Sequence, residues 1–240
     1  MPRPFLTARW EHLVFLNYAC PRALLDPLVP EGTSLDLWNG EALVSLVGFR
    51  FADTKVRGLP IPGHRTFEEV NLRFYVRRTA PDGTERPAVV FIRELVPRRA
   101  IAFVARTLYN EPYRAVPMAH DVALDRERGG FAEYTWRAEG EPFAMRADVE
   151  GPAGRLEPGT EAAFITEHYW GYTRQRDGGT LEYQVEHPPW EIWTAHEARF
   201  TGPAAALYGP AFGEVLAAAP QSAFVAWGSE VAVYPGQRLA

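Results

Sequence analysis

The chain has 240 residues and a formal net charge of −5, with 47% hydrophobic and 23% charged residues. This composition is typical of a globular protein with a sizeable core, and the acidic balance argues against a strongly basic nucleic-acid-binding protein. Apolar runs are short and interrupted, and the N-terminus lacks the apolar core of a signal peptide. We therefore expect one cytoplasmic domain over residues 1–240, without a nucleic-acid or membrane partner.

Two chemically important residue types occur once each. Cys20 is the single cysteine, which excludes an internal disulfide and a multi-cysteine metal site. Lys55 is the single lysine, so only its side chain could form an imine with a carbonyl substrate. The neighbouring Asp53 and Arg57, followed by a stretch rich in glycine and proline, predict an exposed loop and an ordinary surface lysine.

Apolar periodicity predicts about eight strands and four short helices. In chain order the expected strands are Ala42–Phe51, Glu69–Arg78, Ala88–Leu95, Phe131–Ala138, Phe143–Glu150, Thr180–His187, Trp193–Phe200 and Phe224–Tyr234. The expected helices are Pro21–Leu28, Arg98–Leu108 (with Ile101, Val104 and Leu108 on one side), Glu161–His168 (capped by Thr160) and Pro210–Ala219. Because successive strands resemble hairpins, we expect a mainly β (α+β) fold whose antiparallel sheet is curled or closed.

The strand Glu69–Arg78 alternates strictly between apolar and polar residues. Glu69, Asn71 and Arg73 share one face, because side chains two residues apart on a strand point the same way. This polar face either meets solvent or lines the interior of a curled sheet as a ligand pocket. In a pocket, arginine would hold a carboxylate through two parallel hydrogen bonds, and the glutamate would act as acid or base.

Other polar segments give weaker signals. The six histidines lack the spacing of a metal site, so we expect no metal and no cofactor. The segment 108–117 mixes aromatic, acidic and basic residues between prolines, and it is either a capping loop or part of a site. The segment His187–Trp193 favours a rigid turn with core anchors over a wall on which a ligand stacks.

Several short motifs occur along the chain in the same order as in a known family. They are Trp10–Leu13, Pro21–Leu25, Leu28–Gly32, Phe67–Val76, Pro112–Arg114, His187–Trp190, His196–Ala198 and Thr201–Pro203. The pattern resembles the uncharacterised YqjF-like proteins (domain of unknown function 2071) and, more distantly, acetoacetate decarboxylase. The resemblance covers most of the chain.

This resemblance implies an acetoacetate-decarboxylase-like antiparallel β-barrel or cone, with a few peripheral helices and an interior pocket. The decarboxylases carry a pocket carboxylate near the match of Glu69, which favours Glu69 over Glu68. They also carry an imine-forming lysine beside a second lysine, after a proline. Two stretches could match that motif, Pro97-Arg98-Arg99 and Pro112-Tyr113-Arg114, and neither contains lysine. Because arginine stays protonated, it cannot replace the amine nucleophile, and a Schiff-base decarboxylase is rejected unless Lys55 reaches the pocket.

We therefore expect the chain to bind a small carboxylate or oxo compound in an interior pocket. It is either a lyase- or hydrolase-like enzyme that forms no imine or a binding protein without catalysis. A third alternative is a structural or oligomerisation module with a vestigial pocket, and a homo-oligomer stays open. In the enzyme, Glu69 would be the acid or base and Arg114 would orient the anion. The further expected ligand contacts are Asn71, Arg73, Tyr113, Arg98 and Arg99.

Overall fold

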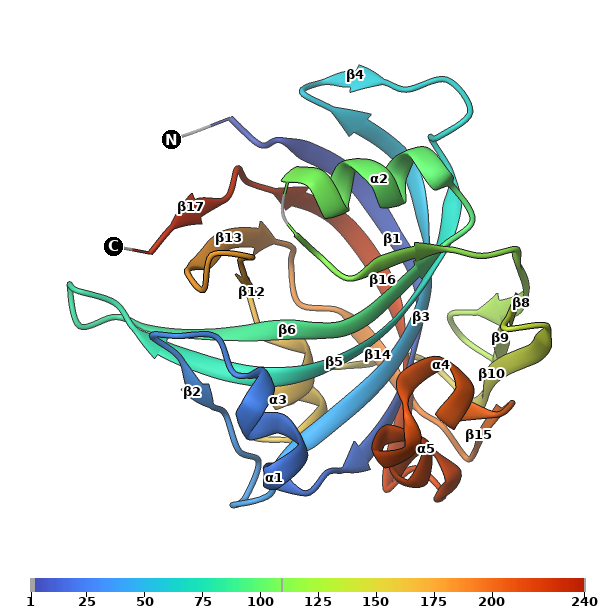
Figure 1. Ribbon diagram of the computed structural model, residues 1–240. Helices are drawn as coiled ribbons and strands as arrows, with labels where there is room; N and C mark the ends of the chain where they lie inside the picture. The colour runs from blue at the N-terminus through green and yellow to red at the C-terminus, as the bar shows by residue number, and fades with distance from the viewer. Residues whose placement is uncertain (1–2, 109, 240) are drawn as a thin grey trace.

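The larger of two sheets closes on itself. The computed structural model describes residues 3–108 and 110–239, and the side chains of residues 104–106 and 108 lie outside that description. Seven strands of the larger sheet form a ring (Figure 1), and in chain order they are β1 (Leu6–Ala19), β3 (Leu43–Val56), β5 (Phe67–Thr79), β6 (Glu85–Val96), β12 (Trp170–Arg174), β13 (Thr180–Glu186) and β16 (Ser222–Val233). Neighbouring strands around this ring follow the order β16-β1-β3-β5-β6-β12-β13, and β13 pairs again with β16.

The ring is antiparallel except at one junction. β6 and β12 run parallel through two residue pairs, whereas the seam between β13 and β16 is antiparallel and joins Val185 to Val233 and Glu186 to Ala232. Short strands extend the sheet, namely β2 (Ser34–Leu35), β4 (Leu59–Pro60), β7 (Tyr113–Ala115), β11 (Gly154–Arg155), β14 (Glu191–Thr194) and β17 (Gln237–Arg238). The expected mainly β fold with a curled or closed antiparallel sheet is confirmed.

A second, four-stranded sheet packs against the outside of the ring. Its order is β15 (Glu197–Thr201), β10 (Glu141–Glu150), β9 (Gly129–Ala138) and β8 (Met118–Asp125), and β9 and β10 form the predicted hairpin. The approach is close at Gly48 of β3, where an added Cβ would lie 2.6 Å from Met145 Sδ and 2.9 Å from Tyr134 Cδ2. Glycine at this position therefore lets the two sheets meet.

The helices are short and peripheral (Figure 1). They are α1 (Arg22–Leu25), the 3₁₀ helix η1 (Asp26–Leu28), α2 (Arg99–Leu108), α3 (Glu161–Thr166), α4 (Ala204–Tyr208) and α5 (Pro210–Ala217). Thr160 caps α3 as expected, because its Oγ1 accepts a hydrogen bond from Ala163 N at 3.2 Å. On the predicted apolar side of α2, Ile101 is partly buried, and Val104 and Leu108 are outside the described side chains. Among the described residues, no helix is both long and apolar enough to cross a membrane.

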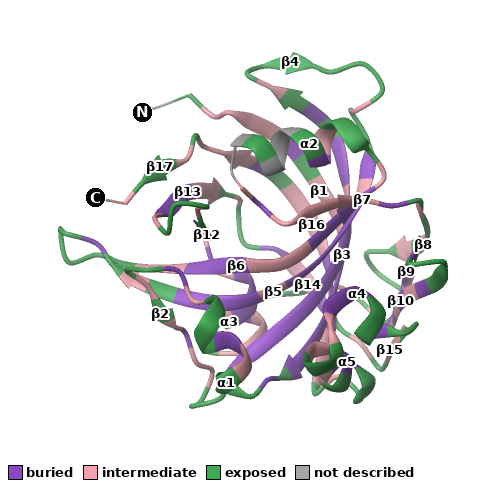
Figure 2. Ribbon diagram, viewed as in Figure 1, coloured by how far each residue is buried: buried purple, intermediate pink, exposed green. Residues whose placement is uncertain are grey.

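Each long ring strand has two packed faces, and β3 and β5 are buried along most of their length (Figure 2). Their outward residues, such as Leu46 and Leu72, pack beneath the second sheet and α4–α5. Their inward residues, such as Val47 and Phe49, surround the interior of the ring. The cluster of outward residues, here called the outer core, therefore holds the strands in place. The inward residues shape the space that the ring encloses.

Three parts of the secondary structure differ from the sequence prediction. The described residues contain more strands than eight, and the longest omission is β1. The predicted strand Trp193–Phe200 divides into β14 and β15, which belong to different sheets. The segment predicted to be irregular between residues 108 and 117 contains β7, which pairs with β6 in parallel.

Candidate functional site

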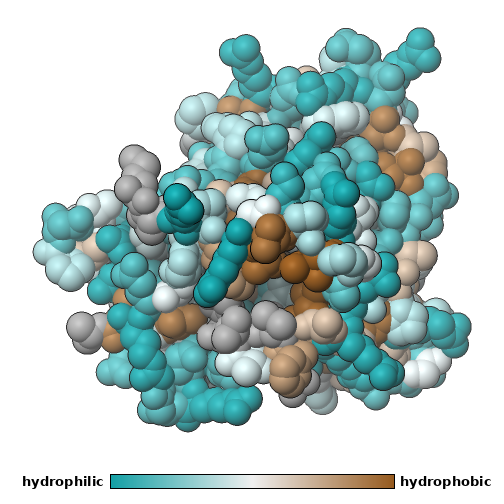
Figure 3. Space-filling model, turned by 90° about the horizontal axis from the view of Figure 1, so that it is seen from above, coloured by the Kyte–Doolittle hydropathy of each residue, from teal (hydrophilic) through white to brown (hydrophobic). Residues whose placement is uncertain are grey.

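The ring encloses a cavity of about 410 Å³. Seen from the end of the molecule that carries α2 and β4, hydrophobic side chains gather around a hollow near the centre (Figure 3). Apolar residues make up most of the lining, namely Phe5, Leu6, Trp10, Leu13, Val47, Phe49, Phe51, Val56, Ile61, Phe67, Val89, Phe91, Ala100, Ile101, Trp170, Val185, Trp190 and Val233. A few polar groups in such walls are typical of a small-molecule site.

The polar face of β5 points into this cavity. Glu69, Asn71 and Arg73 all line it, as the alternation of the strand indicates for a curled sheet. Asn71 Nδ2 donates a hydrogen bond to Glu69 Oε1 at 3.1 Å. Glu68, by contrast, points outward and lies 2.7 Å from His120 Nδ1. Of the two adjacent glutamates, Glu69 is therefore the one that can meet a ligand in the cavity.

Tyr113 and Arg114 lie on opposite faces of β7. Tyr113 lines the cavity, and its hydroxyl donates to Glu69 Oε2 at 2.9 Å. Arg114 is not part of the lining, and its guanidinium pairs with Glu139 at the surface. Neighbouring residues of a strand point to opposite sides, which is why only one of the two enters the cavity. The expected placement of Arg114 next to the ligand is therefore corrected.

The other arginine pair is also outside the cavity. Arg98 and Arg99 are exposed at the start of α2, whereas Ala100 and Ile101, further along the chain, contribute to the lining. Their expected contact with a ligand is corrected too, because the turn into α2 leaves both side chains in solvent. Of the two stretches that could match the proline-lysine-lysine motif, only Pro112-Tyr113-Arg114 places a side chain in the cavity, and that side chain is a phenol.

Lys55 does not supply an amine to the cavity. It lies near the end of β3 rather than in a loop, and its side chain is exposed, while its neighbours Thr54 and Val56 are in the lining. Among the described residues, the lining contains no primary amine. Imine formation at this site therefore has no donor group within the described chain.

Two further glutamates line the cavity, and the sequence analysis missed the first of them, Glu94. Glu94 of β6 is opposite Asn71 of β5 and next to Tyr113 of β7 in the strand register. Glu111, just before β7, accepts hydrogen bonds from Tyr183 at 2.8 Å and from Thr173. Both glutamates are buried and line the cavity.

Burial makes the three carboxyl groups unusually basic. It raises the pKa of Glu69 to about 7, although hydrogen bonds from Asn71 and Tyr113 oppose the shift. It likewise raises the pKa of Glu111 to about 7. The pKa of Glu94 rises well above its ordinary value because of burial and the nearby charges of Glu111 and Glu69. At neutral pH the cluster therefore holds protons that it can exchange.

Arg73 is the positive group in the cavity lining. No carboxylate pairs with its guanidinium among the described residues. One terminal nitrogen donates to the carbonyl oxygen of Ile165 at 3.3 Å, and Nε is buried without a described partner. The guanidinium carbon lies 5.3 Å from the centre of the Phe15 ring and 5.7 Å from that of Tyr75. A partly buried guanidinium with unused donors is suited to an anionic ligand.

Three histidines also line the cavity, namely His64, His168 and His187. His168 Nε2 lies 3.4 Å from Asp36 Oδ2, and burial lowers the pKa of His168. His187 stacks on Trp190 with ring centres 4.1 Å apart, and burial lowers its pKa to about 4. Trp190 is both a buried anchor and part of the lining, so the two interpretations of its segment are compatible. No cluster of three or more His, Cys, Asp or Glu in the described chain is arranged to hold a metal ion.

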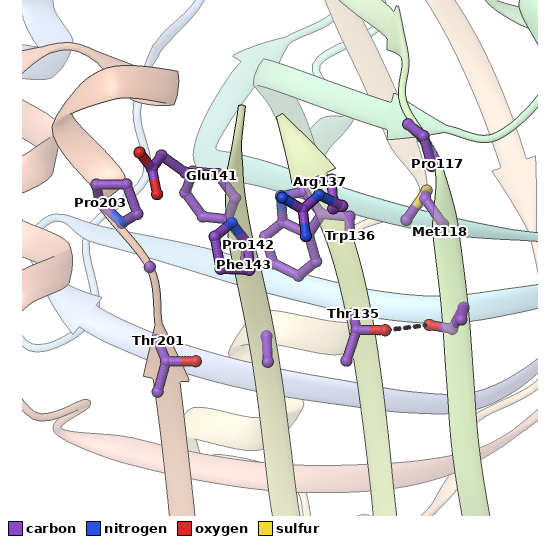
Figure 4. Close-up of a pocket in the computed structure, with 13 residues that line it drawn as sticks. Pro117, Met118, Thr135, Trp136, Arg137, Glu141, Pro142, Phe143, Thr201 and Pro203 are labelled. Atoms are coloured by element: carbon purple, nitrogen blue, oxygen red, sulfur yellow. Dashed lines mark hydrogen bonds between the residues drawn. The ribbon is translucent and has the colours of Figure 1, made fainter. Parts of the chain in front are cut away.

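A second hollow lies at one end of the four-stranded sheet (Figure 4). It has a volume of about 610 Å³, and Trp136, Phe143 and Pro203 are among its lining residues. Thr135 Oγ1 donates to the carbonyl oxygen of Ala119 at 3.5 Å, as Figure 4 shows. The charged lining residues here, Arg137 and Glu141, are exposed to solvent. The interior cavity instead holds buried, interacting acid groups and a cation that pairs with no described carboxylate, and it is therefore the candidate functional site.

The sequence matches the DUF2071 family, described as an uncharacterized conserved protein, over residues 7–230. The chain belongs to this family. It is 28% identical over 191 residues to the uncharacterized protein YqjF of Bacillus subtilis (strain 168), a match that covers 78% of this chain and 74% of that protein. The resemblance found in the sequence motifs is therefore confirmed.

Solved structures confirm the acetoacetate-decarboxylase-like fold of this DUF2071 protein. The enduracididine biosynthesis enzyme MppR, complexed with pyruvate, superposes with a TM-score of 0.68 at 14% identity, covering 100% of this chain and 91% of that one. Acetoacetate decarboxylase from Legionella pneumophila gives a TM-score of 0.66 at 14% identity, covering 99% and 87%. Identities this low establish the shared fold alone.

Proposed function

We propose that this DUF2071 protein binds a small carboxylate or oxo compound in the interior cavity. The observation that carries the proposal is Arg73, a cation in mostly apolar walls whose guanidinium has no carboxylate partner among the described residues. A carboxylate of the ligand would satisfy the free guanidinium donors through charge-assisted hydrogen bonds. Arg73 thus takes the role that the sequence analysis gave to Arg114. The complex of MppR with pyruvate shows that one protein of this fold accepts such a ligand.

The cavity also supports acid–base chemistry without an imine. Burial brings the pKa of Glu69 to about 7, where a carboxyl group both accepts and returns protons at neutral pH. The Tyr113 hydroxyl donates to Glu69 and fixes its orientation. We assign Glu69 as the residue that exchanges a proton with an oxo compound, at the carbon next to its carbonyl group. The chain would then be a lyase- or hydrolase-like enzyme acting on a small oxo or carboxylate compound.

A binding protein without catalysis is the second candidate. It is supported by the predominance of apolar walls, which favour retention of a ligand over activation of water. The third alternative, a vestigial pocket filled by its own side chains, is disfavoured by a free volume of about 410 Å³.

We also propose that residues 1–240 act as one domain in the cytoplasm, because both sheets share the outer core and Cys20 is a buried free thiol.

Calorimetric titration with pyruvate as the probe tests the anion contact. Arg73→Gln should weaken binding by about 10-fold to 100-fold, the loss expected for a charged hydrogen bond of about 1.5–3 kcal/mol. Arg73→Lys should retain part of the affinity, because it keeps the charge without the planar fork. Arg114→Gln is the matched control and should bind like the wild type. Equal affinities for wild type and Arg73→Gln would remove Arg73 from the site.

Deuterium exchange separates the enzyme from the binding protein. The methyl protons of pyruvate, followed by NMR in heavy water, should exchange faster with the wild type than with buffer alone. Glu69→Gln should abolish that acceleration and retain binding. Tight binding with no acceleration would establish the non-catalytic alternative for this ligand class.

A further inference from the structure

We propose that the natural ligand is a small zwitterion, with its anionic end at Arg73 and a positively charged N–H group at Asn71 and Glu94. This inference rests on the proposed function and deepens it, because it adds a second charge to the ligand class. It concerns a part of the cavity that the carboxylate contact alone leaves unused.

Two buried oxygen atoms in the cavity have no hydrogen-bond partner among the described residues. Asn71 Oδ1 and Glu94 Oε2 are each shielded from solvent and form no hydrogen bond among the described residues. The Asn71 amide is oriented by its Nδ2, which donates to Glu69, so Oδ1 is left as an acceptor. Unsatisfied buried acceptors are rare in folded proteins, and a ligand that donates to them removes their cost.

The two acceptors are neighbours on adjacent strands. Asn71 of β5 and Glu94 of β6 are directly paired in the antiparallel register, and both side chains line the cavity. Such opposed residues have Cβ atoms about 4.5–5.5 Å apart. One donor group with two or more N–H bonds, such as an ammonium or guanidinium, can therefore reach both oxygens.

The surrounding charge favours a cationic donor. Glu69 and Glu111 lie close enough to Glu94 for their charges to raise its pKa, so a positive group beside Glu94 would be stabilised by neighbouring carboxylates. Arg73 does not neutralise this region through an ion pair with any described carboxylate, since its hydrogen bond goes to the backbone at Ile165. A bound cation would lower the proton affinity of the cluster, and Glu94 would release a proton on binding.

The spacing of backbone positions along β5 guides the choice of probe. Asn71 and Arg73 are two residues apart on one strand, which corresponds to about 7 Å. A cavity of about 410 Å³ holds a molecule whose charged groups are separated by a chain of that length. An extended ω-amino acid with four methylene groups, 5-aminopentanoate, is a probe with this separation.

The test compares 5-aminopentanoate with pentanoate, which lacks the amine, and pentylamine, which lacks the carboxylate. In titration calorimetry at pH 7, we expect the zwitterion to bind at least 10-fold more tightly than either matched probe. Titrations in two buffers of different ionisation enthalpy should show net proton release with 5-aminopentanoate and none with pentanoate. Shortening the chain to 3-aminopropanoate should reduce the affinity.

Variants test which residue contacts each end of the ligand. Glu94→Gln should reduce the affinity for 5-aminopentanoate at least 10-fold and leave that for pentanoate unchanged, whereas Glu214→Gln on the exposed face of α5 should change neither. Arg73→Gln should weaken both. Because proton release is measured with the wild-type protein alone, the proposal stays testable if a cavity variant fails to fold. If pentanoate binds as tightly as 5-aminopentanoate and depends on Arg73, the zwitterion is refuted and the proposed function stands. If no carboxylate probe binds, both fail.

Discussion

Replacing Glu69 with glutamine should change how the stability of the protein depends on pH. Burial raises the pKa of Glu69 to about 7 in the folded chain, against an ordinary value of 4.5. Below pH 4.5 the carboxyl group is protonated in both states. Between pH 4.5 and 7 the unfolded chain loses this proton first, so the free energy of unfolding falls as pH rises. Above pH 7 both states are ionised and the loss is complete.

The size of the effect follows from the difference between the two pKa values. A difference of about 2.5 pH units, at about 1.4 kcal/mol per unit, is worth about 3 kcal/mol in total. Most of this loss occurs between pH 4.5 and 7, and it is nearly complete by about pH 8. Since a glutamine does not titrate, the stability of Glu69→Gln relative to the wild type should improve by about 2–3 kcal/mol over this range.

Urea denaturation followed by tryptophan fluorescence at pH 5, 6, 7 and 8 measures this difference. The control is Glu214→Gln, which removes an exposed glutamate on α5 and should leave the pH dependence unchanged. If Glu69→Gln and the wild type lose or gain stability in parallel across the whole range, then Glu69 is not desolvated in the folded protein. The account of its role as an acid or base near neutral pH would fall with it.

Three further outcomes are expected. Borohydride treatment with pyruvate or acetoacetate should leave no mass-shifted peptide at Lys55, which is exposed and outside the lining, and a trapped adduct would restore imine chemistry. Gly48→Ala should cost about 1–3 kcal/mol in urea denaturation, because its Cβ would meet Met145 at 2.6 Å, whereas Gly154→Ala, with 3.8 Å of room, should cost far less. Thr160→Ala should cost about 1 kcal/mol by removing the cap of α3, and unchanged stability would show that the cap is dispensable.

The sequence analysis succeeded where alternation along a strand is unbroken. The inward face of β5 was visible as a period of two, and the structure places Glu69, Asn71 and Arg73 in the cavity. Which face turns inward could not be derived from β5 alone, because a solvent-facing strand has the same pattern. Tyr113 and Arg114 show the same limit, since a short strand of three residues gives no periodicity that tells its two sides apart.

Bulges explain why the sequence analysis missed β1 and the inward position of Glu94 in β6. In β1, Ala8 faces the interior before the irregularity at His12, whose φ is 56°, and Leu13 and Phe15 face it afterwards, so the parity changes within the strand. In β6 the register shifts in the same way between Phe91 and Glu94. Each bulge adds one residue and inverts the faces of the strand, and a search for strict alternation passes over the inward positions beyond it.

The two packed faces of the ring strands have different structural roles. Outward residues of β3 and β5, such as Leu46 and Leu72, pack in the core outside the ring, and inward residues such as Val47 and Phe49 pack with one another around the cavity. Under the proposed function, substitutions at inward positions of β3 and β5 alter the ligand contacts, while the outward packing of these strands is unchanged.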